Sequence, residues 1–78
     1  MEKPKTLRAA RKAAGLTQVQ LSKRTAITQT TISKIEQRYK PLPMISAREA
    51  RRLFRVLGVE PHEVQGILVR EEERAAHD

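Results

Sequence analysis

Hydrophobic residues recur at helical spacing in five successive stretches of this chain. The stretches cover residues 5–14, 18–24, 29–37, 47–57 and 61–68. In the first stretch, one face carries Leu7, Ala10, Arg11 and Ala14, and Gly15 follows where a helix would end. Each stretch therefore predicts an amphipathic helix, and the first helix has an arginine on its inner face.

Two helix starts follow each other closely in the middle of the sequence. Thr17 and Thr28 are both good N-cap residues, and Gln20 completes a capping box with Thr17. The three residues between these helices, 25–27, leave room only for a tight turn. Hydrophobic staples can form across the two starts, from Leu16 to Leu21 and from Ile27 to Ile32.

Two further helices are expected after a loop. Residues 38–44 contain two prolines and no helical period, so they connect the third helix to the fourth. Ser46 and Glu49 form a capping box ahead of an inner stripe made of Ala50, Leu53, Phe54 and Leu57. Pro61 suits the first turn of a fifth helix that places Val64, Ile67 and Leu68 at helical spacing. Since no strand pattern is found, the sequence predicts an all-α fold of five helices.

The composition fits one small domain. The 78 residues include 17 Leu, Ile and Val and one Phe, which can fill one modest core. Because there is no Cys, neither disulfides nor thiolate metal sites are expected. No apolar run approaches the ~18 residues of a membrane span, and the N-terminus lacks the apolar segment of a secretory signal. We therefore expect a cytoplasmic protein that has no membrane partner.

Positive charge is concentrated in the first two thirds of the chain. Residues 1–55 carry 14 Lys and Arg against 3 Glu, whereas residues 56–78 carry 2 Arg against 6 acidic residues. Segregated basic charge of this kind suits binding to the phosphate backbone of a nucleic acid. The alternative is a soluble basic surface without a ligand.

Two strings of residues carry a resemblance to a known family. They are R-x-x-x-G-L-T-Q, which begins at Arg11, and T-Q-x-T-I-S-x-I-E, which runs from Thr28 to Glu36. With these strings in register, residues 5–68 resemble the helix-turn-helix family of Cro and lambda-type repressors, also called the XRE type. The resemblance implies a compact five-helix domain whose second and third helices form the helix-turn-helix. It also implies that the chain binds double-stranded DNA as a homodimer, and we expect no cofactor.

The resemblance implies that the third helix contacts the base edges of DNA. Its two isoleucines face the core, which leaves Gln29, Thr30, Ser33, Lys34 and Gln37 on the open face. Gln29 can pair with adenine, Thr30 can offer its methyl group to thymine and Lys34 can donate to guanine. Ser33 completes the set of base-contacting candidates. The alternatives are a solvated Gln29, a Lys34 that touches only phosphate and a Ser33 that merely permits close approach.

Phosphate contacts are expected on both sides of the reading helix. Gln18 matches a family position that meets a phosphate with its side chain and the positive end of a helix dipole. Arg38, Tyr39 and Lys40 follow the third helix where the family touches the DNA backbone. The alternatives are that Gln18 is a first-turn residue that binds no phosphate, and that the loop side chains are only solvated.

Arg11 and Glu36 match a family pair that joins the first helix to the end of the third. Since a partly buried Arg or Glu would be costly alone, we expect a structural ion pair, and Arg11 is also a candidate phosphate contact. Two features depart from the family pattern. Ala26 stands in the turn where Gly is common, and a left-handed conformation there costs about 1 kcal/mol. The loop after the third helix also lacks the usual early Gly and looks long.

The function that follows from the resemblance is sequence-specific transcription regulation, by occupying an operator and blocking or recruiting polymerase. One such domain buries too little DNA to be selective alone, so two copies on half-sites one helical turn apart are expected. The expected dimer surface surrounds the fifth helix and holds Val59, Ile67, Leu68 and Val69. The alternative is that these residues belong to an ordinary core.

A different class of function is an antitoxin-like or accessory module whose main partner is another protein. Residues 69–78 form an acidic extension beyond a DNA-binding domain of residues 1–68, and this extension either continues the fifth helix or frays. An enzyme is not expected, because His62 and His77 have no clustered metal-binding partners and there is no Gly-rich phosphate loop.

Overall fold

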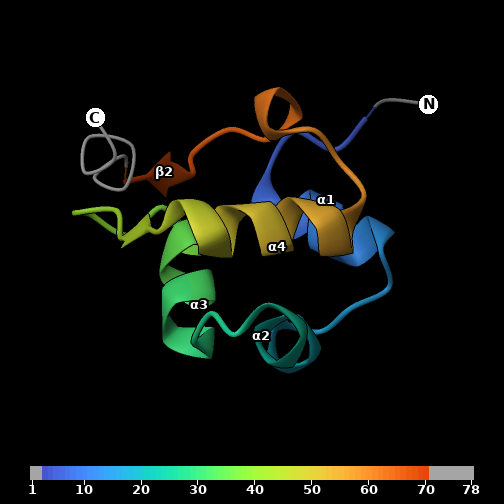
Figure 1. The fold of residues 1–78 in the computed structure, drawn as a ribbon, viewed down its shortest axis with the longest axis horizontal. Coiled ribbons are helices and arrows are strands. Elements are labelled where there is room, and N and C mark those ends of the chain that lie inside the picture. Colours follow the sequence, from blue (N-terminus) through green and yellow to red (C-terminus); the bar gives the residue numbers. More distant parts are fainter. Residues whose placement is uncertain (1–2, 71–78) are drawn as a thin grey trace.

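Four α-helices and two very short strands make up the part of the chain, residues 3–70, that the computed structural model describes (Figure 1). The elements are α1 (Leu7–Ala13), α2 (Gln18–Thr25), α3 (Gln29–Gln37), β1 (Met44–Ile45), α4 (Ala47–Leu57), the 3₁₀ turn η1 (Pro61–Glu63) and β2 (Leu68–Val69). No helix within these residues is long and apolar enough to cross a membrane.

Each of the four α-helices begins at a side-chain cap. The two predicted capping boxes are present, from Thr17 to Gln20 and from Ser46 to Glu49. The hydroxyl of Thr6 accepts a hydrogen bond from the Ala9 N–H at 3.1 Å, so α1 begins at Leu7 and not at residue 5 as predicted. A Thr or Ser at these positions supplies an acceptor for backbone N–H groups that have no partner inside the helix.

One hydrophobic core holds the four helices together. Its buried side chains are Leu7, Ala10, Leu16, Leu21, Ile27, Ile32, Ile35, Ile45, Ala50, Leu53, Phe54, Leu57 and Val64. The core thus contains both predicted staples and the whole inner stripe of α4. The prediction for Ala14 was wrong: α1 ends at Ala13, and Ala14 is an exposed C-cap residue outside the buried face.

The pair α2 and α3 crosses steeply beneath α4. In Figure 1 α2 is seen nearly end-on and α3 stands nearly upright, while α4 lies across the middle of the molecule. Contacts join α2 to both α3 and α4, and α1 packs against α3. Since α2 is packed from two sides, it fixes the direction in which α3 projects.

Hydrogen bonds hold the turn between α2 and α3 at both ends. The buried Thr25 hydroxyl donates to the Leu21 carbonyl at 2.8 Å and accepts from the Ile27 N–H at 3.3 Å. The Arg52 Nε of α4 donates to the Thr25 carbonyl at 2.9 Å. Between these anchors Ala26 adopts a left-handed conformation, with φ 62° and ψ 21°. The turn therefore has the left-handed geometry that Gly favours, although the residue is Ala.

The prediction of a fifth helix was wrong. Between α4 and residue 70, where the described part of the chain ends, the helical structure is limited to the 3₁₀ turn η1, and Val64 is already extended, with φ −116° and ψ 124°. Gly66 has φ 84°, which is incompatible with continued helix. Val64 is nevertheless buried, so an extended chain satisfies part of the hydrophobic pattern that had indicated a helix.

Short strand pairings replace the fifth helix, although no strand pattern was expected. β1 and β2 run parallel, with Met44 opposite Leu68 and Ile45 opposite Val69. Next to them, the Arg70 N–H donates to the Ile45 carbonyl at 2.9 Å. β2 spans the domain boundary expected at residue 68. The rest of the acidic extension, residues 71–78, lies outside the described residues.

We expect Ala26→Gly to raise the free energy of unfolding by ~0.5–1 kcal/mol, because Gly adopts φ 62° without steric cost. Urea unfolding followed by circular dichroism measures the change. The matched control is Ala9→Gly at an exposed position inside α1, which should lower stability by up to ~1 kcal/mol. A loss of stability in both variants would contradict a strained turn at Ala26.

Candidate nucleic-acid interface

A buried ion pair joins the start of the domain to the end of α3. The Arg11 Nε lies 2.6 Å from Glu36 Oε2, and its Nη2 donates to Glu36 Oε1 at 2.9 Å. The side chains of Arg11 and Glu36 are only 10% and 3% exposed. Arg11 Nη1 also donates to the Leu16 carbonyl at 2.9 Å. The pairing of Arg11 with Glu36 is bidentate, which gives it both strength and a fixed geometry.

The ion pair continues into a chain of side-chain amides that reaches α3. Gln18, the first residue of α2, donates from Nε2 to Glu36 Oε1 at 3.0 Å. Gln29, the first residue of α3, donates from Nε2 to Gln18 Oε1 at 3.5 Å. Because the Gln18 amide donates to Glu36, its oxygen is turned toward Gln29. The first residues of the two helices are therefore bonded directly to each other, and Gln18 links Gln29 to Glu36.

The Glu36 carboxylate stays ionised in this environment. Burial alone would raise its pKa, but hydrogen bonds from Arg11 and Gln18 and the charges of Arg11 and Arg8 lower the pKa below its ordinary value. The hydrogen bond to Glu36 raises the pKa of Arg11 against the opposing effect of burial. Both partners are thus charged throughout the physiological range of pH.

The outer face of α3 lines a shallow hollow of about 400 Å³. Its lining residues are Gln18, Gln29, Thr30, Ser33, Lys34, Gln37 and Tyr39. All four predicted base-contacting residues therefore share one surface with two of the predicted phosphate contacts. Gln37 had been assigned no role, yet its Nε2 donates to the Ser33 hydroxyl at 3.1 Å, which orients Ser33 on this surface.

Tyr39 reaches the hollow because the chain reverses at the end of α3. Arg38 is the C-cap in a left-handed conformation, with φ 55°, and the Tyr39 N–H donates back to the Lys34 carbonyl at 2.9 Å. The Lys34 ammonium then lies 5.9 Å from the centre of the Tyr39 ring, within the range of a cation–π contact. Tyr39 is 59% exposed, so its ring and hydroxyl remain accessible.

A second, smaller hollow of about 300 Å³ lies beside the ion pair. It is lined by Arg8, Arg11, Gln18, Glu36 and Gln37. Arg8 is exposed on α1 and was not predicted to belong to the site. Its position in the turn before Arg11 was the only signal in the sequence. Arg8 adds a cation at this hollow beyond Arg11, whose guanidinium is already bonded to Glu36 and Leu16.

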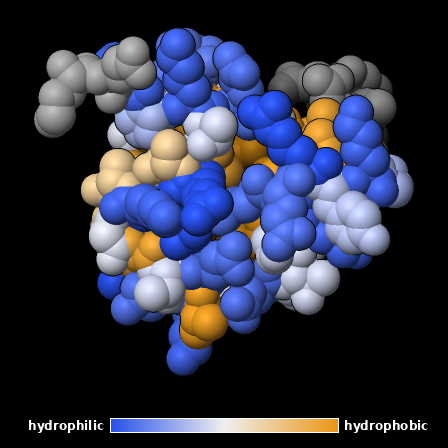
Figure 2. Space-filling view, turned by 180° about the vertical axis from the view of Figure 1, so that it is seen from behind, coloured by the Kyte–Doolittle hydropathy of each residue, from blue (hydrophilic) through white to orange (hydrophobic). Residues whose placement is uncertain are grey.

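The structure separates the other predicted phosphate contacts from these two hollows. Arg38 and Lys40 are exposed in the loop after α3 and line neither hollow. The view from the side opposite to Figure 1 shows a mostly hydrophilic face with small separate hydrophobic patches (Figure 2). Within residues 3–70 no group of three or more His, Asp or Glu side chains is arranged to hold a metal ion.

We expect Arg11→Met to lower the free energy of unfolding by ~3–5 kcal/mol, because the buried Glu36 carboxylate would lose its charged partner and keep only the Gln18 amide. The double variant Arg11→Met/Glu36→Met should lose less than the sum of the two single losses, since no buried charge remains. Urea unfolding of the wild type and the three variants measures the coupling free energy. Additive losses would show that the two side chains do not stabilise the fold as a pair.

The lowered pKa of Glu36 predicts a pH dependence. The ionised Glu36 stabilises the fold fully above its unfolded pKa, near 4.5, and this contribution is lost as the pH falls through its lower folded pKa. The stability difference between the wild type and Glu36→Gln should therefore shrink as the pH falls below about 4.5. Urea unfolding at several pH values measures it, and a constant difference would contradict the shifted pKa.

Comparison with protein families gives an independent result. A family model described as a helix-turn-helix domain matches residues 5–65, which include α1 to α4 and the whole of both hollows. Neither a curated protein nor a solved structure matches the chain. The match is consistent with the Cro-like XRE type inferred from the sequence strings. Because it spans most of the sequence, the chain belongs to the helix-turn-helix domain family.

Proposed function

We propose that this protein is a sequence-specific regulator of transcription that binds double-stranded DNA and reads the major groove with α3. The observation that best supports this function is the coupling of Gln29, on the outer face of α3, to the buried pair of Arg11 and Glu36 through Gln18. A reading surface that is held in place before DNA arrives needs little rearrangement on binding.

Gln29 is suited to recognise adenine. Its Nε2 carries two N–H groups, and only one of them is used in the hydrogen bond to Gln18. The second N–H can donate to adenine N7 while Oε1 accepts from adenine N6. Thr30, Ser33 and Lys34 lie on the same hollow, so the neighbouring base pairs meet a methyl group, a hydroxyl and an ammonium.

Phosphate contacts would flank this readout on both sides. Gln18 lies at the start of α2, where backbone N–H groups and the helix dipole favour an anion. Arg8 and Arg11 lie next to it in the smaller hollow. On the other side, Arg38, Tyr39 and Lys40 follow α3 and are all exposed. Such contacts fix the register of the protein on DNA without reading sequence.

The protein is proposed to act as a homodimer. Among the four residues expected at the dimer surface, only Leu68 is exposed, at 42%; Val59, Ile67 and Val69 pack against the core. Met44, the register partner of Leu68, is 52% exposed. These two side chains form an apolar pair on the outer face of the sheet. We assign the contact between two copies to this pair. The dimer would repress transcription by occupying an operator.

Titration with a short duplex, followed by amide chemical shifts, tests the proposed face. The largest changes are expected at Gln18, Gln29–Gln37 and residues 38–40, and only small changes at Arg48 and Arg55 on α4. Changes spread evenly over all exposed cations would indicate general charge attraction and would contradict a reading face on α3.

We expect Gln29→Ala to weaken binding to the preferred duplex by ~1–3 kcal/mol and to relax the preference at one base pair, because both groups that read adenine are lost. Fluorescence anisotropy on the preferred duplex and on its single base-pair variants measures both effects. An equal loss on random DNA would contradict a role for Gln29 in base readout.

We expect Lys40→Ala to weaken binding alike on all sequences and to make the salt dependence shallower by about one counterion, because one phosphate contact is removed. Anisotropy titrations over a series of salt concentrations measure the slope. Arg48→Ala removes a cation to which we assign no DNA contact and should leave the slope unchanged. Equal slopes for Lys40→Ala and the wild type would remove Lys40 from the interface.

A further inference from the structure

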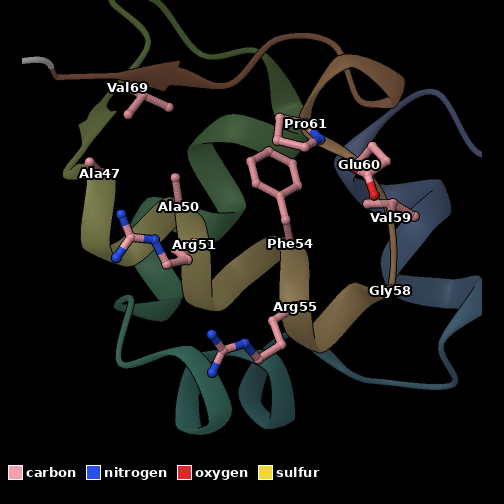
Figure 3. Close-up of a pocket in the computed structure, with 10 residues that line it drawn as sticks. All are labelled: Ala47, Ala50, Arg51, Phe54, Arg55, Gly58, Val59, Glu60, Pro61 and Val69. Atoms are coloured by element: carbon pink, nitrogen blue, oxygen red, sulfur yellow. The ribbon is translucent and has the colours of Figure 1, made fainter.

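An apolar groove of about 690 Å³ runs along α4 (Figure 3), and none of its lining residues belongs to the hollow on α3. Its apolar lining consists of Ala47, Ala50, Phe54, Val59, Pro61 and Val69. Within residues 58–70 the chain beside α4 forms η1 and β2 in place of the predicted fifth helix, and Pro61 and Val69 from these elements line the groove. Ala50 and Phe54 lie at its floor and are only 7% and 9% exposed.

Three residues of the groove follow helical spacing on α4. Ala47, Ala50 and Phe54 lie along one side of α4 at i, i+3 and i+7, a span of about 10 Å or two helical turns. The two alanines leave depth for large side chains at one end. In Figure 3 the Phe54 ring points toward Pro61, and Val59 and Glu60 lie beyond it at the other end. An amphipathic helix recognised in such a groove inserts aliphatic side chains spaced three or four residues apart.

The rim of the groove carries unpaired positive charge. Arg51 and Arg55 line it and are both exposed on α4. Within residues 3–70 the ion pairs are those of Lys3 with Glu63 and of Arg11 with Glu36, and neither involves the two rim arginines. Their spacing of four residues corresponds to about 6 Å along the helix axis. Two carboxylates at i and i+4 of an opposing helix have the same spacing.

We propose that this groove binds an acidic amphipathic helix of another protein. The aliphatic side chains of that helix fill the space above Ala47, Ala50 and Phe54, and two of its carboxylates pair with Arg51 and Arg55. The groove shares no lining residue with the hollow on α3, so one molecule can hold DNA and the partner helix together.

Charge and strand geometry argue against two other occupants, a second copy of this chain and DNA. In a two-fold contact through the groove, Arg51 and Arg55 of one copy would face the same cations of the second copy, with Glu60 as the sole acidic residue of the lining. The apolar pair of Met44 and Leu68 lies on the opposite face of the sheet from Val69. DNA phosphates would satisfy the two arginines but would leave the apolar floor uncovered.

The test uses the full 78-residue chain and a synthetic helical peptide of about 16 residues. The peptide carries leucines at i, i+3 and i+7. Two glutamates, four residues apart from each other, flank the leucine face at other positions. We expect binding at 0.15 M salt with amide shifts at Ala47, Ala50 and Phe54. Arg51→Glu/Arg55→Glu should weaken it about tenfold, because two ion pairs become repulsive. The matched control Arg48→Glu removes an exposed α4 cation outside the groove and should change affinity less than about twofold.

A peptide with lysines in place of the two glutamates should bind Arg51→Glu/Arg55→Glu better than the wild type, which a merely destabilised variant would not do. If charge reversal unfolds the domain, Arg51→Gln/Arg55→Gln is measured instead. Equal losses for Arg48→Glu and the rim variant would overturn the proposal, as would unshifted groove amides. A rim variant that loses affinity for random duplex DNA but not for the peptide would also overturn the proposal. Peptide binding that appears only after residues 71–78 are removed would overturn it too.

Discussion

The buried pair of Arg11 and Glu36 is the interaction on which the arrangement of the other elements depends. It ties α1 to the end of α3 across 25 residues of sequence, and Gln18 adds the start of α2 to the same carboxylate. Burial of either charge alone would be unfavourable, so the pair is stable only when all three helices are in place. The same network ends at Gln29, and the interaction that specifies the fold therefore also orients the first residue of the proposed reading helix.

Local signals in the sequence predicted the starts of α2, α3 and α4 correctly. The capping boxes at Thr17 and Ser46 and the staples around them depend on residues only a few positions apart, so they can be read without knowing the fold. The prediction of a fifth helix failed because the apolar spacing after Pro61 also fits an extended chain. There, Gly66 at φ 84° and the hydrogen bond from Arg70 to Ile45 decide the outcome.

The candidate site shows the same limit of sequence reasoning. The family resemblance located the outer face of α3, and the structure gathers its four proposed base contacts on one hollow. The membership of Arg8 and the return of Tyr39 over Lys34 depend on how α1 packs and on the left-handed Arg38. The return of Tyr39 has no local signature, and that of Arg8 is limited to its position in the turn before Arg11. The roles proposed for all these residues in DNA binding remain predictions.

Two surfaces with different chemistry emerge from one small core. The face around α3 is polar and flanked by cations, which suits a base edge and its phosphates. The groove on α4 is apolar with an arginine rim, which suits an acidic helix. α2 packs against both α3 and α4, so the two surfaces share one rigid support. A regulator of this form could hold an operator and recruit a second protein without large conformational change.

Selection of bound duplexes from a random DNA pool, followed by sequencing, tests sequence-specific recognition by this domain most directly. At about 0.15 M salt, non-specific attraction between exposed charges is largely screened. We expect enrichment of an inverted repeat whose half-sites lie about one helical turn apart, with a base pair whose preference is lost in the Gln29→Ala variant. A folded protein that enriches no sequence would contradict the account.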